Sequence, residues 1–308
     1  MSKAVRLAII GVGKIVLDRH LPALAANPGF EVVALVEPRG SMLDLPCFAS
    51  LAALLAAQLE VDAVVIATPP QVREGLALTA LDVGLHVFLE KPPAATVGGA
   101  RRLIQHCHAD QTLFAAWHSR EAAMVDRARQ WLQGRTIAKG ALRWREDARR
   151  WHPGQQWLWQ PGGLGVFDPT INGLSILTSI STERFSVSRA DFEVPANQHA
   201  PIAVQAILAS EQGEIILDLD FRETDQQCWS IEVETKDGGR LELTDGGKTL
   251  RLDAEAPESG EDREYERLFA RFAHLIASGK SDADVTPLEL VADAFLVARH
   301  RSAAEFQP

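Results

Sequence analysis

Two short segments carry residue types from which a reaction centre can be built. The first is HVFLEKPP (86–93), where an apolar run ends in Glu90 and Lys91 and two prolines follow at once. Charged side chains are rarely buried without partners, and a Pro-Pro pair cannot continue a central strand. We therefore interpret strand, charged pair and rigid turn as one unit that faces a ligand. A surface salt bridge before a proline turn is the alternative.

The second segment is GGLGVFDPTING (162–173), which holds Asp168 and Asn172 four residues apart. If Pro169 opens a helix, this spacing places both side chains on one face, one turn apart. An aspartate before a proline is also a good helix N-cap. Capping therefore competes with a chemical role for Asp168.

The elements that must position these segments change character along the chain. In the first 120 residues, strand patterns at 5–10, 30–36, 61–67, 86–89 and 112–117 alternate with helical patterns. Pro22 is expected to kink or break the helix predicted over 14–26. Repeated strand–helix units predict an α/β fold with a doubly wound parallel sheet.

A glycine turn follows the first strand. Gly11 permits a tight turn, and Gly13 lets the backbone approach a pyrophosphate at a helix N-terminus. Lys14 and Ile15 come next and are predicted to bind the same dinucleotide, whereas Val16 occupies the third glycine position of the fingerprint and weakens the match. A purely structural glycine turn is the alternative.

Two further strand ends are predicted to contribute to the cofactor site. Glu37, 26 residues after Gly11, would accept hydrogen bonds from the ribose of NAD, whereas Arg39 could pair with the 2′-phosphate of NADP. The sequence therefore allows either NAD or NADP as the cofactor and favours NAD. Thr68 and Pro69, in ATPP, would line the crevice outside the strand ends, although plain turn chemistry explains these prolines equally well.

The second part of the chain reads differently. Strand patterns joined by short turns predict a C-terminal α+β domain with an open, mostly antiparallel sheet. We expect a dinucleotide-binding domain over 1–120 and a substrate-binding and dimerisation domain over 121–308. The strand-like stretches lie at 137–145, 185–194, 203–210, 214–221, 228–235 and 240–243, and helices are expected at 122–133, 262–277 and 287–301.

Composition excludes several classes of protein. The 308 residues carry 31 basic and 41 acidic side chains, a net charge of −10, which argues against nucleic-acid and anionic-membrane partners. Three widely spaced cysteines form no disulfide framework or CxxC motif. With no export signal or apolar run long enough to span a membrane, we expect a cytoplasmic protein. The HCH at 106–108 is not expected to bind a metal, because adjacent helical residues face different directions.

The glycine turn, ATPP, EKPP and the antiparallel half together resemble the Gfo/Idh/MocA oxidoreductases, which join a Rossmann domain to an open-sheet domain. Within that family, WREDARRWHPGQQW (144–157) and PGGLGVFDPTIN (161–172) are similar to bacterial L-arabinose/D-galactose 1-dehydrogenases. The resemblance implies oxidation of the anomeric C1 hydroxyl of an aldopyranose to a lactone, with NAD or NADP as hydride acceptor.

The resemblance also implies roles for the two segments. The lysine of EKP, here Lys91, would donate to the reacting oxygen, and Glu90 would lie near the nicotinamide ribose, with the Lys-Pro turn, trans or cis, fixing both. Most of the family carries a histidine base where this chain has Asn172, which cannot take a proton. Asp168 is therefore the candidate general base, with Lys91 as its rival. The ammonium lowers the pKa of such a carboxylate whereas burial raises it.

Sugar contacts are expected from a tryptophan-rich segment and two outlying residues. Indole faces suit the C–H faces of a pyranose, while charged groups bind its hydroxyls. The expected contacts are Glu146, Trp151, His152, His118 and Trp229. The glycines at 162, 163 and 165 are expected to let their loop approach the cofactor.

The sequence is also compatible with two other functions. A dehydrogenase of the same fold could act on an inositol or another secondary alcohol, which Asn172 disfavours. A non-catalytic NAD-binding regulator is the other. The open sheet predicts a homodimer formed through its exposed face.

Overall fold

A computed structural model describes residues 3–40 and 43–308, in which the chain forms two compact units. The first comprises residues 1–118 and 264–285, and the second 119–263 and 286–308. The predicted helix over 262–277, assigned above to the C-terminal domain, thus belongs to the first unit. Its apolar face explains this placement, because it packs on the first unit's sheet.

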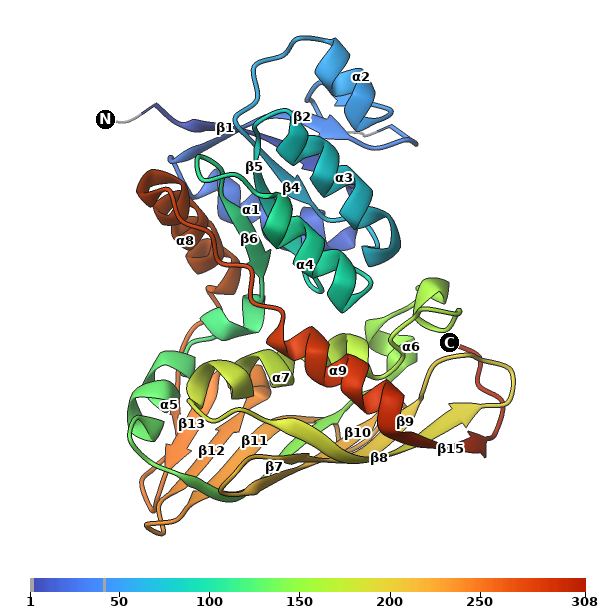
Figure 1. Ribbon diagram of the computed structural model, residues 1–308, viewed down its shortest axis with the longest axis vertical. Helices are drawn as coiled ribbons and strands as arrows, with labels where there is room; N and C mark the ends of the chain where they lie inside the picture. The colour runs from blue at the N-terminus through green and yellow to red at the C-terminus, as the bar shows by residue number, and fades with distance from the viewer. Residues whose placement is uncertain (1–2, 41–42) are drawn as a thin grey trace. The chain divides into compact units, whose positions relative to one another are not determined.

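The sheet of the first unit is wholly parallel, with the order β3-β2-β1-β4-β5-β6 (Figure 1). This is the strand order of a dinucleotide-binding fold, with its switch point between β1 and β4. The strands are buried apolar runs, as expected for a parallel sheet covered on both faces. They are β1 (Val5–Ile10), β2 (Phe30–Val36), β3 (Cys47–Phe48), β4 (Ala63–Ile66), β5 (His86–Glu90) and β6 (Leu113–Ala116).

Helices cover both faces of this sheet. On one face α1 (Leu21–Ala25) and α8 (Glu264–Ser278) bury a core with Leu7 and Ile9, and on the other lie α2 (Leu51–Ala56), α3 (Pro70–Asp82) and α4 (Val97–His106). Phe269 of α8 stacks on Phe88 of β5, with ring centroids 5.2 Å apart. The chain does not break at Pro22: the π-helix η1 (Val16–His20) passes directly into α1, and His20 and Leu21 at the junction keep helical backbone angles.

The second unit is built on a nine-stranded sheet of order β14-β13-β12-β11-β7-β10-β9-β8-β15. Six of its eight strand pairings are antiparallel, and β7–β10 and β8–β15 are parallel. The mostly antiparallel sheet is therefore confirmed. Its strands are β7 (Ile137–Arg145), β8 (Ser186–Pro195), β9 (Ala203–Ala209), β10 (Glu214–Asp220), β11 (Cys228–Thr235), β12 (Arg240–Thr244), β13 (Thr249–Leu252), β14 (Glu258–Ser259) and β15 (Ala298–Ala303).

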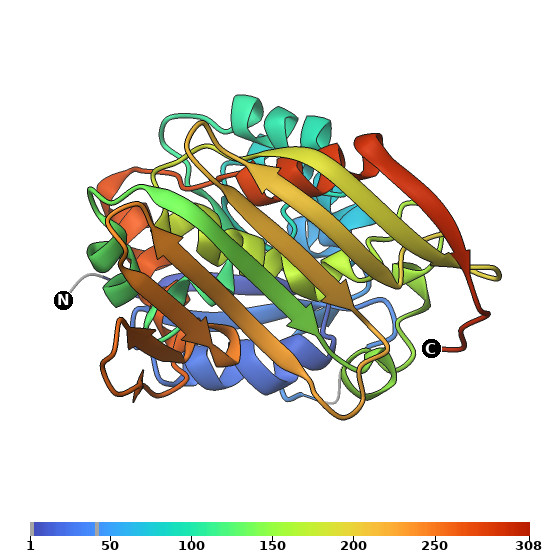
Figure 2. The ribbon, with the colours of Figure 1, turned by 90° about the horizontal axis from the view of Figure 1, so that it is seen from below.

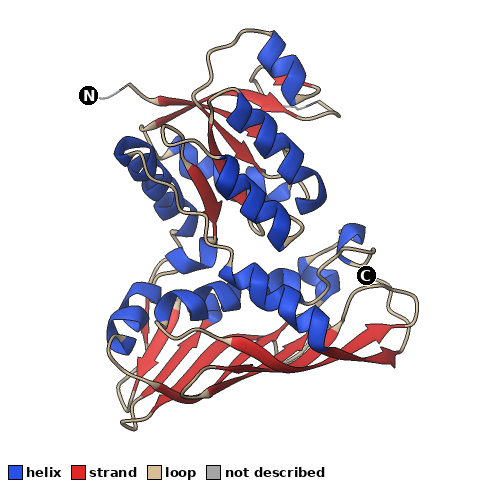
Figure 3. Cartoon of the chain, viewed as in Figure 1, coloured by secondary structure: helices blue, strands red, loops and turns tan. Residues whose placement is uncertain are grey.

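Helices cover one face of this sheet and leave the other open. Phe167 of α7 (Phe167–Ile180) and Phe295 of α9 (Thr286–Val297) both pack on Phe192 of β8, at centroid distances of 5.5 and 5.1 Å. Figure 2 shows the opposite face, and Figure 3 shows helices on one side of the strands only. The shorter helical segments are η2 (His118–Glu121), α5 (Val125–Leu132), α6 (Ala148–Trp151), η3 (Gln156–Leu158) and η4 (Asp245–Gly247).

Candidate functional site

The glycine turn of the first unit has the geometry that a dinucleotide requires. Gly11 has φ +86°, and a Cβ there would lie 3.0 Å from Thr68 Cγ2 and 3.2 Å from the Ala67 carbonyl carbon. Only glycine fits without strain. A Cβ on Gly13 would meet nothing within 4 Å, so that the backbone there is open to a ligand.

A polar atom without a partner lies beside this turn. Thr68 Oγ1 is buried, and the described residues supply no hydrogen bond to it. A buried hydroxyl is normally paired, so the atom fits a ligand group at the turn. Pro69 is the N-cap of α3, which begins at Pro70. The residues present therefore fit a dinucleotide at the ends of β1 and β4.

Glu37 follows β2 and is joined to the glycine turn. Its Oε2 accepts a hydrogen bond from the Val12 amide at 3.1 Å, and its Oε1 lies 3.7 Å from Arg39 Nε. The Arg39 side chain is 94 % exposed. The Glu37 carboxylate thus lies where the ribose of a dinucleotide is expected, with the exposed guanidinium of Arg39 beside it.

The residues after Gly13 divide between surface and core. Lys14 is exposed and pairs with Asp18 in the first turn that follows, and Ile15 is also exposed. Val16, the first residue of η1, is fully buried and belongs to the core between this helix and the sheet. The departure from a third glycine is thus a packing feature of this chain, since Val16 fills the space between helix and sheet.

The EKP turn is anchored from inside by a buried carboxylate. Glu90 is 5 % exposed; its Oε1 accepts hydrogen bonds from His20 Nε2 and Tyr265 Oη, both at 2.8 Å, and its Oε2 accepts one from the Lys91 amide at 3.0 Å. Burial alone would raise the pKa of Glu90, but the hydrogen bond and positive field of His20, with those of His118 and Tyr265, lower it to about 2. The Lys91–Pro92 peptide bond is cis.

Arg73 of α3 holds the same turn from the other side. This buried guanidinium donates to the carbonyls of Glu90, Pro92 and Thr68, and so ties the end of β5 to the end of β4. Sequence reasoning missed Arg73, His20 and Tyr265. The signal available for Arg73 was a basic residue in the first turn of the helix that follows ATPP.

His118 follows β6 in the first unit. Its Nδ1 lies 2.6 Å from Glu264 Oε2, and its ring stacks on Tyr265 at a centroid distance of 5.6 Å. The structure thus places His118 beside Tyr265, which in turn donates a hydrogen bond to Glu90 under the EKP turn. Its predicted contact with a sugar stays a prediction.

In the second unit, Asp168 and Asn172 lie one turn apart on α7, as the spacing predicted. The N-cap of α7 is Val166, with no side-chain cap, so Asp168 is inside the first turn and the capping alternative is wrong. Negative side chains are stabilised at this end of a helix. Asp168 is 5 % exposed. The Oδ1 atom of Asn172 is buried and receives no hydrogen bond from the described residues, which leaves an acceptor for a hydroxyl.

The glycine loop before α7 serves packing inside the second unit. Gly165 has φ +53°, and a Cβ there would lie 2.2 Å from the Pro201 carbonyl oxygen. A Cβ on Gly163 would lie 2.2 Å from the Leu158 carbonyl oxygen. These glycines allow close approach to their own unit, which accounts for them without the expected approach to a cofactor.

Glu146, His152 and Trp229 form one hydrogen-bonded cluster next to Asp168. Glu146 is 4 % exposed; its Oε1 lies 2.8 Å from His152 Nε2, and its Oε2 accepts a hydrogen bond from Trp229 Nε1 at 2.6 Å. His152 Nδ1 lies 4.0 Å from Asp168 Oδ2. The structure therefore turns Glu146 inward, behind His152, and its expected contact with a sugar is less direct than predicted.

Two indoles provide the apolar surface of this region. Trp151 is 45 % exposed and meets Trp229 edge to face, with ring centroids 5.8 Å apart. Trp151 Nε1 also donates to Gln227 Oε1 at 2.6 Å. Trp144 and Trp159, from the same sequence cluster, are buried in the core. Only part of the tryptophan-rich segment is thus available to a ligand.

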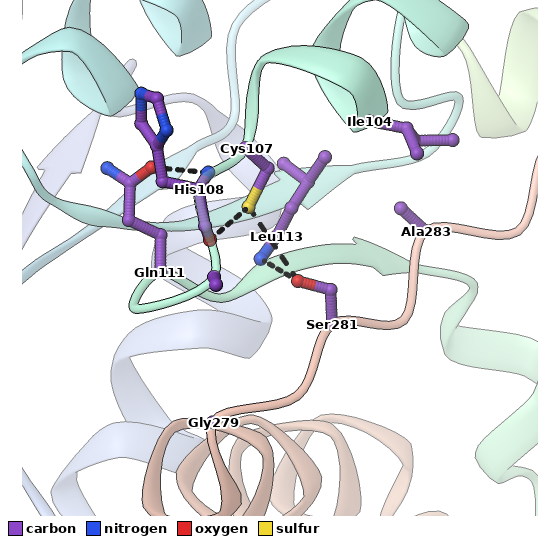
Figure 4. A pocket seen from close by; sticks show the side chains of 9 residues that line it. Ile104, Cys107, His108, Gln111, Leu113, Gly279, Ser281 and Ala283 are labelled. Atoms are coloured by element: carbon purple, nitrogen blue, oxygen red, sulfur yellow. Dashed lines mark hydrogen bonds between the residues drawn. The ribbon is translucent and has the colours of Figure 1, made fainter.

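A separate pocket of about 350 Å³ opens on the first unit (Figure 4). It is lined in part by Cys107, whose Sγ lies 3.7 Å from Ser281 Oγ, and by Leu113 at the start of β6. Burial raises the pKa of Cys107, which makes its thiol a poor nucleophile. Ligands of such sheets bind at the carboxyl ends of the strands. This pocket, at an amino end, is therefore not the candidate site.

Residues 3–40 and 43–308 contain neither a candidate metal site nor a candidate membrane-spanning helix. No group of three or more His, Cys, Asp or Glu side chains in these ranges is arranged to hold a metal. No helix within them is both long and apolar enough to cross a membrane.

Comparison with known proteins identifies the family. Residues 5–118 match the family described as "Oxidoreductase family, NAD-binding Rossmann fold". A galactose 1-dehydrogenase of Pseudomonas fluorescens is 39% identical over 303 residues, which cover 98% of both chains. The crystal structure of a D-galactose-1-dehydrogenase protein from Rhizobium etli matches with a TM-score of 0.92 at 41% identity, over 100% of this chain and 99% of that one.

A more distant structure shares the fold alone. It is the WlbA dehydrogenase from Bordetella pertussis, solved with NADH and UDP-GlcNAcA, with a TM-score of 0.82 at 19% identity over 96% of both chains. The match of residues 5–118 to the family and the similarity to the two galactose dehydrogenases confirm the resemblance inferred from the glycine turn, ATPP and EKPP. This chain belongs to the Gfo/Idh/MocA family of oxidoreductases.

Proposed function

We propose that this protein oxidises the anomeric C1 hydroxyl of an aldopyranose to the lactone, with NAD or NADP as hydride acceptor and D-galactose, L-arabinose or a close relative as substrate. The observation that carries the proposal is the pair on α7, a buried carboxylate and an amide with an unused acceptor, one turn apart. The similarity to two galactose 1-dehydrogenases over nearly the whole chain supports the substrate class.

The first unit would hold the cofactor, which supplies the hydride acceptor. The turn at Gly11 and Gly13 would receive its pyrophosphate, and Glu37 would bind the ribose hydroxyls. Thr68 would use its unpaired hydroxyl on the same ligand. The Glu37 carboxylate repels a 2′-phosphate, which supports NAD over NADP.

The reaction asks three things of this chain's own side chains. Asp168 accepts the proton of the C1 hydroxyl as the C1–H leaves as hydride. Lys91, on a turn fixed by Glu90 and Arg73, donates a hydrogen bond to the reacting oxygen. Asn172 hydrogen-bonds the same or a neighbouring hydroxyl, and holding the sugar in one pose supplies much of the rate.

Initial rates of nicotinamide reduction test this function. The purified protein is supplied with NAD or NADP and, in parallel, with D-galactose, L-arabinose, D-glucose and myo-inositol. We expect reduction with the first two and a lactone as the product. Reduction with myo-inositol alone would favour a secondary-alcohol dehydrogenase, and tight cofactor binding without turnover on any of them would favour a regulator.

We also propose that the protein is a cytoplasmic homodimer in which a second copy covers the open face of the nine-stranded sheet. That face carries both signs of charge, for example the Arg145–Asp218 pair at 3.2 Å between β7 and β10, and exposes Ile216. The three cysteines are free thiols, which suits a reducing compartment. Light scattering of the purified protein measures the mass, and Ile216→Asp is expected to shift it toward that of one chain.

A further inference from the structure

We propose that His152 is a proton relay, oriented by Glu146, which takes from Asp168 the proton that Asp168 accepts from the sugar. This inference rests on the proposed function and deepens it. It gives a role to the two buried groups that lie behind Asp168, and it concerns side chains of the second unit alone.

The carboxylate of Glu146 fixes the tautomer of His152. Glu146 is buried and receives Trp229 Nε1–H on one oxygen, while its other oxygen lies 2.8 Å from His152 Nε2. A carboxylate held between two N–H groups is an acceptor only. The proton of the neutral imidazole therefore lies on Nε2, and the lone pair lies on Nδ1.

That lone pair faces Asp168. The distance from His152 Nδ1 to Asp168 Oδ2 is 4.0 Å. The amide oxygen of Gln155, which is also an acceptor, lies 3.4 Å from the same nitrogen, but the 2.8 Å contact of the Glu146 carboxylate with Nε2 is much shorter and decides where the proton lies. An ionised carboxylate and an imidazole lone pair have no proton to share, so a separation beyond hydrogen-bond length is expected. Once Asp168 has been protonated, its O–H can donate to Nδ1, and the two groups can close to hydrogen-bond distance.

The proton then moves in two balanced steps. In the first, the O–H and C1–H bonds of the sugar break, the C1=O bond of the lactone forms, and an O–H bond forms on Asp168; the bound nicotinamide would take the hydride. In the second, the Asp168 O–H bond breaks and an N–H bond forms at His152 Nδ1. The imidazolium lies between two carboxylates, Glu146 and regenerated Asp168, and loses its proton to water through a side chain that is 14 % exposed.

The arrangement explains how the chain manages without a histidine at position 172. Asn172 can orient a hydroxyl but cannot hold a proton. An imidazole reaches Asp168 instead from the segment after α6, and Phe221 packs against that ring at a centroid distance of 5.2 Å. The charged groups at its two nitrogens are Glu146 and Asp168. If His152 only held Asp168 in place, its imidazole would be expected to hydrogen-bond Asp168 in the protein without substrate.

The test compares steady-state kinetics of the whole protein with those of His152→Gln and Glu146→Gln, using D-galactose or whichever aldose the wild type oxidises fastest. We expect His152→Gln to lower kcat roughly 100-fold with little change in KM. We expect Glu146→Gln to lower kcat less and to move the acidic limb of the pH profile toward lower pH, because the negative charge beside the imidazole is lost.

His300→Gln, the same change on exposed β15, is the matched control and should leave kcat and the pH profile unchanged. Melting curves and cofactor binding establish that each variant folds; if His152→Gln does not, the pH profile of Glu146→Gln decides. The relay is overturned if folded His152→Gln keeps wild-type kcat, or if Glu146→Gln changes KM alone and leaves the limb in place. A wild type that oxidises no aldose overturns the proposed function itself, before any variant is compared.

Discussion

Glu90 and His20, separated by 70 residues in sequence, share a buried hydrogen bond of 2.8 Å beneath the EKP turn. His20 is fully buried, and Tyr265 donates to the same carboxylate oxygen from α8. A carboxylate at this depth requires such partners, because an unpaired buried charge is very costly. The turn that carries Lys91, the proposed catalytic lysine, is thus held by a polar cluster that is assembled from three distant elements.

This cluster makes the stability of the protein depend on pH. The pKa of Glu90 falls from an ordinary 4.5 to about 2 on folding. The unfolded chain therefore binds the proton first, so this stabilisation is complete above about pH 5 and is lost as the pH falls toward 2. The shift corresponds to about 3 kcal/mol. Unfolding by urea at pH 7 and at acidic pH should show a smaller acid-induced loss in Glu90→Gln than in the wild type.

The matched control for that experiment is Glu60→Gln, which removes an exposed carboxylate from the same unit. It should reproduce the pH dependence of the wild type. An unchanged acid loss in Glu90→Gln would show that Glu90 is not the group responsible.

Removal of one hydroxyl from the cluster should weaken it measurably. Tyr265 is the only tyrosine of the chain, and Tyr265→Phe deletes a hydrogen bond to a charged group. We expect a loss of about 2 kcal/mol in the free energy of unfolding at pH 7. Because the Lys91 amide donates a hydrogen bond to the same carboxylate, kcat should fall as well. Unchanged stability would mean that the hydroxyl contributes no net energy.

Asp168→Asn tests the proton acceptor on α7. The amide keeps the shape and can still hydrogen-bond a hydroxyl, but it cannot take a proton, so kcat should fall by about 10²–10⁴-fold. Cofactor binding, followed by fluorescence titration, should be unchanged because Asp168 belongs to the second unit. Comparable losses in cofactor affinity and kcat would indicate misfolding instead.

Glu37→Gln tests the basis of cofactor choice. The variant keeps an acceptor for the Val12 amide but removes the charge that repels a 2′-phosphate. We expect kcat/KM with NADP to rise relative to that with NAD, by roughly tenfold. Arg39→Ala, which changes an exposed neighbour, should move the ratio the other way. A ratio that is the same in all three proteins would remove Glu37 from the cofactor site.

The sequence was a good guide wherever the signal was local. The glycine turn, the ends of β4 and β5, and the one-turn spacing of Asp168 and Asn172 follow from short patterns, and each appears in the structure where it was expected. Local rules suffice there because turns and strand ends are determined by residues that adjoin in sequence.

Long-range placement could not be predicted in the same way. The amphipathic pattern of α8 shows that one face is buried but not which sheet it covers, and the helix returns to the first unit. β15 (Ala298–Ala303) begins inside the helix predicted over 287–301 and extends beyond it; the sequence did not show it, because an exposed edge strand with mostly polar side chains has no alternating pattern. The convergence of His20, Arg73 and Tyr265 on one turn likewise depends on tertiary packing.

The claim that the anomeric hydroxyl is the group oxidised can be tested by one comparison of substrates. Nicotinamide reduction is measured with D-galactose and with methyl β-D-galactopyranoside, which has every ring hydroxyl except the one at C1. The account predicts reduction with the free sugar and none with the glycoside. Equal rates with both, or no reduction with either D-galactose or L-arabinose, would contradict it.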